Sequence, residues 1–221
     1  MTLSVVVPML NAAGGLSATL APLQGVDEIV AVDGGSTDDG PELAKSLGAK
    51  VIAAPRGRGG QLQAGAAAAT SDWLLFLHAD TVLAHDWRVC AAAFIADPAN
   101  RDKAAVFRFA LDDDGLAARR LEAMVAWRVK WLGLPYGDQG LLIHRDLYDR
   151  LGGIKPLPLM EDVEFVRRIG AANIVRLPAV ARTSATRWRR DGWLRRSARN
   201  LACLGLYFVG VPPRLLKKLY D

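Results

Sequence analysis

Residues 26–38 read VDEIVAVDGGSTD, and this stretch decides the fold. Its first part is a short apolar run rich in β-branched residues, which is typical of a strand buried on both faces of a sheet. The run ends in Asp33, and Gly34 and Gly35 then allow a sharp turn. Ligands of open α/β sheets bind beyond the carboxyl ends of the strands. The stretch therefore predicts a central strand with a ligand-binding aspartate at its tip.

The alternation of strand and helix continues on both sides of this stretch. We expect further strands at 3–10, 49–54 and 72–80, and helices at 12–23, 40–47, 60–69 and 84–96. This alternation predicts an α/β fold with a mostly parallel sheet covered by helices on both faces. After residue 97 the pattern becomes mixed. We expect strands at 104–112, 139–145, 173–178 and 180–186, helices at 116–132, 145–151 and 161–169, and a helical tail from Gly192.

The composition limits the class of protein. The chain has 221 residues, 51% of them hydrophobic, which suits one compact domain. Cys90 and Cys203 lie far apart in apolar stretches, so they predict neither a disulfide framework nor a zinc site and fit a reducing cytoplasm. The first apolar run lacks a preceding basic region, which favours a strand over a signal peptide. The longest apolar run, residues 201–213, is well below the roughly 20 residues that a membrane-spanning helix needs.

The net charge of +5 is concentrated near the C-terminus. Residues 182–221 hold ten lysines and arginines against two aspartates, so the rest of the chain is slightly acidic. Such a tail either binds an anionic partner or forms a solvated helix face. Trp193 and Leu201 alternate in it with Arg195 and Arg199, as in helices that lie in a membrane interface. We therefore expect a cytoplasmic protein, with contact to the inner face of the membrane and a lipid-linked acceptor as hypotheses, and no nucleic-acid partner.

Two other strand ends carry informative residues. The first strand ends in PMLN, residues 8–11, where a dinucleotide-binding fold would have G-x-G-x-x-G, and this argues against a dehydrogenase. The third strand leads into PRGRGGQ, residues 55–61, and then into a helix. Free N–H groups and the helix dipole make such a turn an anion site, and Arg56 and Arg58 add positive charge.

The fourth strand delivers His78-Ala79-Asp80. Residues at i and i+2 of a strand point the same way, so His78 and Asp80 share one side. This arrangement suits a divalent cation, Mn²⁺ or Mg²⁺, bound between the protein and a diphosphate. The four strand ends can converge on one crevice, and that convergence is more informative than any single motif.

These motifs together resemble those of family 2 glycosyltransferases. In chain order, P-x-x-N corresponds to Pro8–Asn11, V-D-D-G-S-T-D to Val32–Asp38, D-x-D to His78–Asp80 and the late E-D pair to Glu161–Asp162. Two positions depart from the pattern, since Gly34 and His78 each replace an aspartate. The R-G-R-G-x-Q stretch, the HAD variant and the basic R-W tail resemble a small bacterial subgroup called selenodomain-associated transferases.

The resemblance implies a GT-A-type fold, a nucleotide diphosphate sugar as donor with a UDP-sugar favoured, a divalent cation, and transfer with inversion at the anomeric carbon. It implies one domain over residues 1–221, divided into a nucleotide-sugar-binding half (1–100), an acceptor half (101–185) and a basic helical tail (186–221).

The resemblance also implies roles for individual residues. Asp33 would hold the base or ribose, Asp80 the metal with His78 beside it, and Asp162, next to Glu161, would be the general base. The candidate donor-binding residues are Pro8, Asn11, Asp33, Gly34, Arg56, Arg58, Gly59, His78, Asp80 and Arg187.

The chemistry of transfer makes separate demands. Cleavage at the anomeric carbon builds negative charge on the leaving diphosphate, which a metal and arginines stabilise, and the acceptor alcohol needs a base. Asp138 and Gln139 precede a strand and are expected to line the acceptor pocket. Arg187 would contact the diphosphate and Trp188 would stack on a sugar ring, as in Q-x-x-R-W motifs.

Three alternatives compete with this hypothesis. A nucleotidyltransferase would carry its glycine-rich basic loop directly after the first strand, where residues 8–11 stand here. A haloacid-dehalogenase-like phosphatase would need an aspartate nucleophile at the position of His78, which argues against that class. A catalytically degenerate module that only binds nucleotide or lipid stays open because His78 stands in the metal motif.

Overall fold

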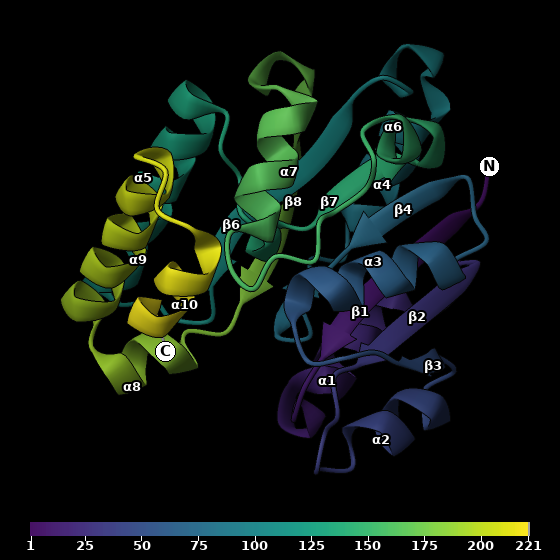
Figure 1. Ribbon diagram of the computed structural model, residues 1–221. Helices are drawn as coiled ribbons and strands as arrows, with labels where there is room; N and C mark the ends of the chain where they lie inside the picture. Colours follow the sequence, from purple (N-terminus) through teal and green to yellow (C-terminus); the bar gives the residue numbers. More distant parts are fainter. Residues whose placement is uncertain (221) are drawn as a thin grey trace.

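The computed structural model describes residues 1–220 and contains an eight-stranded sheet with the strand order β3-β2-β1-β4-β7-β6-β8-β5 (Figure 1). The strands are β1 (Leu3–Met9), β2 (Glu28–Asp33), β3 (Lys50–Ala53), β4 (Trp73–Phe76), β5 (Thr81–Leu83), β6 (Ala104–Leu111), β7 (Leu141–His144) and β8 (Ile174–Thr183). The first four strands pair in parallel, and β7 and β5 pair antiparallel with their neighbours. This confirms the predicted α/β fold with a parallel N-terminal half and a mixed C-terminal half.

Ten α-helices connect and follow these strands within residues 1–220. They are α1 (Ala13–Leu20), α2 (Gly40–Ser46), α3 (Arg58–Ala68), α4 (Trp87–Ala96), α5 (Leu116–Leu132), α6 (Arg145–Arg150), α7 (Glu161–Ile169), α8 (Thr186–Asp191), α9 (Trp193–Phe208) and α10 (Pro213–Tyr220). Figure 1 shows α8, α9 and α10 grouped beside the C-terminal part of the sheet, away from β2 and β3. Asp221, the last residue of the expected tail, lies outside the described residues.

The core occupies both faces of the sheet, as the continuous apolar strands predict. On one face Val5 and Val7 of β1 pack with Leu16 of α1 and Trp87 of α4. On the other face Val6 packs under α3 and α7 in a cluster with Val30, Val32, Leu62, Leu74, Phe76 and Phe165. The helix α3 comes very close, because a Cβ at Gly65 would lie 2.3 Å from Val6 Cγ1. The parallel register, from Ser4 opposite Glu28 to Met9 opposite Asp33, aligns the tips of β1 and β2.

Two strand predictions are wrong for reasons of long-range pairing. The expected strand at 72–80 ends at Phe76, and Thr81–Leu83 form a separate strand that pairs with β8. The strands expected at 173–178 and 180–186 are one strand, β8. The register of its pairing with β6 shifts between Val106 and Arg108. Pro178 lies at this irregularity, where the N–H group that proline lacks is not needed for a hydrogen bond between the strands.

The C-terminal segment is helical, as expected from Gly192 onward, although α8 begins earlier, at Thr186. Within residues 1–220, none of the helices combines the length and the apolarity that crossing a membrane requires.

Candidate functional site

The loop after β2 is built around the carboxylate of Asp33. Its oxygens accept hydrogen bonds from the amides of Gly35 (3.1 Å) and Ser36 (3.0 Å) and from Ser36 Oγ (2.6 Å). Partial burial alone would raise the pKa of Asp33, but these hydrogen bonds outweigh it and lower the pKa, so the carboxylate stays charged. Asp33 thus fixes the shape of the loop, and its contact with a base or ribose stays a prediction.

Asn11 ties the tip of β1 to the same loop. Its side-chain Oδ1 accepts a hydrogen bond from the backbone N–H of Thr37 at 2.8 Å, and its backbone N–H donates to Ser36 Oγ at 2.9 Å. Its φ of 50° lies in the left-handed region, which asparagine tolerates better than most residues. Pro8, by contrast, is buried inside β1 opposite Val32 and forms part of the sheet, and its contact with the donor stays a prediction.

Gln61 of α3 clamps the tips of β1 and β2, and sequence analysis missed this role. Its buried Nε2 donates to the carbonyls of Met9 and Val32, both at 2.8 Å. A Cβ at Gly34 would lie 3.0 Å from Nε2 of Gln61. Glycine at this position therefore leaves room for the clamp, which gives a physical reason for the departure from the V-D-D-G-S-T-D pattern. The donor contact expected of Gly34 stays a prediction.

Arg58 at the start of α3 turns inward. Its Nε forms an ion pair with Oε1 of Glu161 at the start of α7, and the Glu161 side chain is 1% exposed. Burial raises the pKa of Glu161 and Asp162 adds to this, while Arg58 opposes the shift. A carboxylate that is buried and held by a guanidinium can position its neighbours, and the catalytic role expected of Glu161 stays a prediction. The expected diphosphate contact of Arg58 competes with the same ion pair.

The rest of the glycine-rich turn is divided between packing and solvent. A Cβ at Gly59 would lie 2.6 Å from the carbonyl oxygen of Lys155, so residues 155–157 cover this glycine. Gly59 therefore allows close backbone packing, and the anion contact expected of it stays a prediction. Arg56 is exposed and remains a candidate donor contact.

His78 is a neutral imidazole next to positive charge. Burial lowers its pKa well below the ordinary value, and the charges of Arg58 and Arg187 lower it further. Its Nε2 lies 3.4 Å from Nη1 of Arg58. A guanidinium at this distance disfavours a second cation on the same nitrogen, and ligation of a metal by His78 stays a prediction.

Asp80 is the remaining metal-ligand candidate of the motif. Within residues 1–220, the structure gives its carboxylate no hydrogen bond or ion pair, and it brings no three His, Cys, Asp or Glu side chains together as a metal site. An unpaired carboxylate is a fitting ligand for Mn²⁺ or Mg²⁺, and magnesium is often bound through one or two carboxylates plus substrate phosphates. The residues present fit a metal that protein and donor hold jointly.

Asp162 at the start of α7 is bound to the turn Gly137–Gln139. Its Oδ2 accepts a hydrogen bond from the amide of Gly137 at 2.9 Å, and its Oδ1 accepts from the amide of Val163 at 2.8 Å. A Cβ at Gly137 would lie 2.6 Å from Nε2 of His78. Three segments distant in sequence, around residues 78, 137 and 162, therefore meet at one point.

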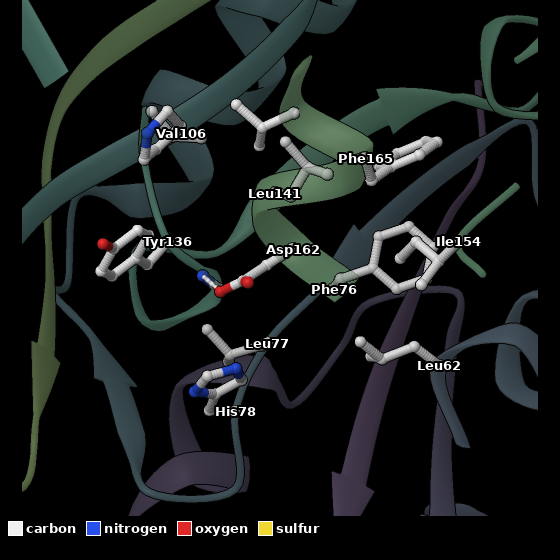
Figure 2. Close-up of a pocket in the computed structure, with 13 residues that line it drawn as sticks. Leu62, Phe76, Leu77, His78, Val106, Tyr136, Leu141, Ile154, Asp162 and Phe165 are labelled. Atoms are coloured by element: carbon white, nitrogen blue, oxygen red, sulfur yellow. Dashed lines mark hydrogen bonds between the residues drawn. The ribbon is translucent and has the colours of Figure 1, made fainter. Parts of the chain in front are cut away.

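A small cavity of about 30 Å³ opens at this meeting point, which is room for about one water molecule. Figure 2 shows His78, Tyr136 and Asp162 among apolar side chains such as Leu141 and Phe165 that line it. The guanidinium of Arg128 lies 3.4 Å from the centre of the Tyr136 ring. The polar groups thus sit at the edge of an apolar environment, which strengthens the electrostatic interactions between them.

Asp138 and Gln139 have different environments although they are neighbours. Burial, opposed by Arg128 and reinforced by Asp162 and Asp80, raises the pKa of Asp138 to about 6. Its buried Oδ1 has no hydrogen-bond partner within residues 1–220. Gln139 is 3% exposed and donates from Nε2 to the carbonyl of Phe107 at 3.1 Å, which supports the turn, and its acceptor contact stays a prediction.

Arg187 and Trp188 are neighbours in sequence but lie in different environments, one exposed and one buried. Arg187 is exposed, and its charge reaches His78. Trp188 is 9% exposed and packs with Val125, Val129 and other residues of one apolar cluster, and its stacking on a sugar stays a prediction.

The sequence assigned no individual role to Gln61, Tyr136 or Gly137. The signal for Gln61 was its place at the end of the R-G-R-G-x-Q stretch, in the first turn of a helix. The contacts of Gly137 come from two distant segments, so the local sequence does not reveal them.

Comparisons with known proteins agree with this geometry. The family model described as "Glycosyl transferase family 2" matches residues 4–152. An uncharacterized glycosyltransferase of Rickettsia typhi is 43% identical over 61 residues, which cover 27% of this chain and 21% of that protein. The match thus spans about a fifth of the length of the curated relative.

Two solved structures have similar folds. TarS of S. aureus aligns over 100% of this chain and 69% of its own, with a TM-score of 0.63 and 17% identity. Glucosyl-3-phosphoglycerate synthase of Mycobacterium tuberculosis, in complex with Mg²⁺ and UDP, aligns over 83% of this chain and 69% of its own, with a TM-score of 0.58 and 22% identity. At these identities the likeness concerns the fold, and it agrees with the predicted GT-A-type architecture.

Proposed function

Because this chain belongs to glycosyl transferase family 2, whose model covers residues 4–152, we propose that it transfers a sugar from a nucleotide diphosphate sugar to an acceptor hydroxyl. The observation that carries the proposal is the meeting of Asp162, His78 and the Gly137–Gln139 turn beside the unpaired carboxylate of Asp80. Crystal structures of the mycobacterial synthase contain UDP-glucose with Mn²⁺. A UDP-sugar is therefore the favoured donor here.

The donor half of the proposal rests on the loops at the tips of β1 and β2. The nucleoside would lie against the loop that Asn11 and Asp33 shape, within residues 1–100. Arg56 is exposed beside this loop and offers a forked donor for phosphate oxygens. Arg187 approaches from the acceptor side and would stabilise the leaving diphosphate.

A divalent cation, Mn²⁺ or Mg²⁺, would be held by Asp80 together with the donor diphosphate. When bound, it would supply Lewis-acid stabilisation of the leaving diphosphate. Arg58 and Arg187 keep the His78 imidazole neutral, so this residue contributes polarity without adding charge next to the diphosphate.

Asp162 is the proposed general base. Its carboxylate would take the proton from the acceptor hydroxyl as that oxygen bonds to the anomeric carbon, while the bond from this carbon to the diphosphate oxygen breaks. A single displacement of this kind inverts the anomeric carbon. The amide of Gly137 holds Asp162 in place, and Asp138 is positioned to bind a further hydroxyl in the acceptor half, residues 101–185.

Contact with a membrane surface is a further part of the proposal, with the protein on the cytoplasmic side. It is supported by exposed aromatic and aliphatic side chains on α5 and α9, where Trp127 is 57%, Trp131 66% and Leu194 88% exposed. Tryptophans and arginines on such helices favour the interface of anionic membranes. Sedimentation with anionic vesicles at low salt tests this part. Equal recovery in the supernatant with and without vesicles would contradict it.

The experiment for the main proposal is a thermal-shift panel of UDP, GDP, ADP, CMP and TDP, each with and without Mn²⁺. A ligand at 100 times its dissociation constant stabilises by about 2.7 kcal/mol, enough to raise the midpoint by several degrees. We expect one nucleotide, UDP, to raise it more with Mn²⁺ than without. The Asp80→Ala variant should lose the Mn²⁺ dependence, and Asp149→Ala on the exposed face of α6 should keep it. No shift with any nucleotide would contradict the proposal.

A further inference from the structure

A second and larger cavity lies between α8, α9 and α10. It has a volume of about 540 Å³, and we call it the arginine basin. Its lining consists of Arg187, Arg190, Asp191, Arg195, Arg196, Arg199 and Tyr220. Five guanidinium groups face one carboxylate, so the lining has an excess of four positive charges.

The single carboxylate of the arginine basin is fully used. Asp191 pairs with Arg190 and Arg196, both at 2.7 Å, and with Arg199 at 3.1 Å. Within residues 1–220, Arg187 and Arg195 have neither a hydrogen-bond partner nor an ion-pair partner. The one carboxylate of Asp191 therefore holds three guanidinium groups together but cannot neutralise all three charges. The guanidinium groups of Arg187 and Arg195 are unpaired.

Arg196 forms the floor of the arginine basin. It is 4% exposed, its Nη1 donates to Asp191, and its Nη2 donates to the Tyr220 hydroxyl at 3.1 Å. The buried Nε atoms of Arg196 and Arg199 have no acceptor within residues 1–220. Both nitrogen atoms are closed to solvent, so the guanidinium groups that an anion in the cavity could contact are the exposed ones of Arg187, Arg190 and Arg195.

The arginine basin lies next to the catalytic centre. Leu216 of α10 packs against Met160 and Val163, which flank Asp162. Arg187 on one wall acts electrostatically on His78, and Tyr220 on another wall acts on Arg58. An anion in the arginine basin would therefore stand on the acceptor side of the proposed base.

The arginine basin is separate from the nucleoside loops. The helix α8 follows β8, whereas those loops follow β1 and β2. Three strands lie between β1 and β8 in the sheet, so at about 4.8 Å per strand these tips are on the order of 19 Å apart. One donor diphosphate next to Asp80 can engage Arg187, but it leaves the other four arginines with the single carboxylate of Asp191 between them.

We propose that the arginine basin binds a phosphate group of the acceptor, so that the sugar acceptor is a phosphate-bearing alcohol with its hydroxyl at Asp162. This rests on the proposed glycosyl transfer. Arginine forks match the geometry of phosphate oxygens and bind them in bidentate fashion. The phosphate is carried either by a soluble ester or by a lipid headgroup, and both present the same chemistry to the basin.

The test is calorimetric titration of inorganic phosphate into the protein saturated with UDP and Mn²⁺. Arg195→Gln removes an unpaired, exposed guanidinium and should weaken phosphate binding about tenfold. The matched control is Arg214→Gln, an exposed arginine of α10 outside the lining, which should bind phosphate like the unaltered protein. Equal phosphate affinity in the two variants would overturn the proposal. So would phosphate binding that is seen without UDP but is absent from the UDP-saturated protein.

Competition then identifies the source of the phosphate. Displacement of inorganic phosphate by glycerol phosphate would support a soluble acceptor, and displacement by phosphatidic acid vesicles, but not by phosphatidylcholine vesicles, would support a lipid acceptor. Displacement by neither would overturn the proposal. Binding of UDP to the same protein tests the proposed transferase separately. If UDP binding failed while phosphate still bound, the proposed transferase would be contradicted and the phosphate site in the arginine basin would not.

Discussion

The amide of Gly137 donates a hydrogen bond of 2.9 Å to Oδ2 of Asp162. This bond joins a turn in the acceptor half to the first turn of α7, and His78 also lies close to the same glycine. The position of the proposed base therefore depends on a residue that carries no side chain.

Replacing Gly137 by alanine should displace this centre. The added Cβ would lie 2.6 Å from Nε2 of His78 and 3.5 Å from Oδ2 of Asp162. Because misplacement of catalytic groups by about 1 Å can cost around a hundredfold in rate, we expect kcat for donor turnover to fall by that order. The control is Gly14→Ala on α1, where no atom lies within 4 Å of the added Cβ. Equal turnover in both variants would contradict the geometry.

Asp162→Asn should separate binding from chemistry. The amide oxygen of asparagine can still accept from Gly137, so the turn should stay in place. The base is lost, and we expect kcat to fall by about 10²- to 10⁴-fold while the dissociation constant of UDP with Mn²⁺ stays unchanged. Single-turnover assays and calorimetry measure the two quantities. A variant that retains full kcat would require a different base.

Glu161→Gln should reduce stability more than a typical surface change. It leaves the inward-turned Arg58 without its counter-charge, so we expect the free energy of unfolding to fall by roughly 1–3 kcal/mol in urea titrations. Arg58→Gln combined with Glu161→Gln should cost less than the sum of the single changes, because the two residues form one ion pair. Additive effects would show that the pair does not stabilise the fold.

Asp138 gives the stability a defined pH dependence. Burial raises its pKa from 3.8 to about 6 in the native state, so the native state binds this proton more tightly than the unfolded chain. The free energy of unfolding therefore falls as the pH rises through this window. Asp138→Asn should be more stable than the unaltered protein at pH 7.5, by roughly 1–3 kcal/mol, and the gain should vanish near pH 3.5. Urea titrations at both pH values, in the presence of EDTA, test this, and the variant Asp149→Asn at an exposed position is the control. A gain that is the same at both values would contradict it.

Much of the fold could be predicted because local patterns determine it. The buried strands at 3–10 and 26–33 are continuous apolar runs, and the polar residues that end them lie together because neighbouring parallel strands end at one edge. The separate strand at Thr81–Leu83 could not be predicted, because it exists only through pairing with β8, about a hundred residues later.

The candidate site, like the fold, could be predicted from the sequence only in part. Residue types at strand ends predict where the site lies, whereas the burial of each side chain depends on segments that are distant in sequence. Glu161, Gln139 and Trp188 were expected to contact ligands, and all three are buried by segments distant in sequence. The arginine basin could be anticipated only as a basic tail, since its shape depends on how α10 packs against α9 and α7.

The most direct test of the central claim is an NMR time course of UDP-sugar turnover with Mn²⁺, in which both the released UDP and the anomer of the first sugar product are observed. The account predicts UDP release that requires Mn²⁺, an inverted anomer as the first product, and loss of both in Asp80→Ala. UDP release that persists at the full rate in Asp80→Ala, or a first product with retained configuration, would contradict it.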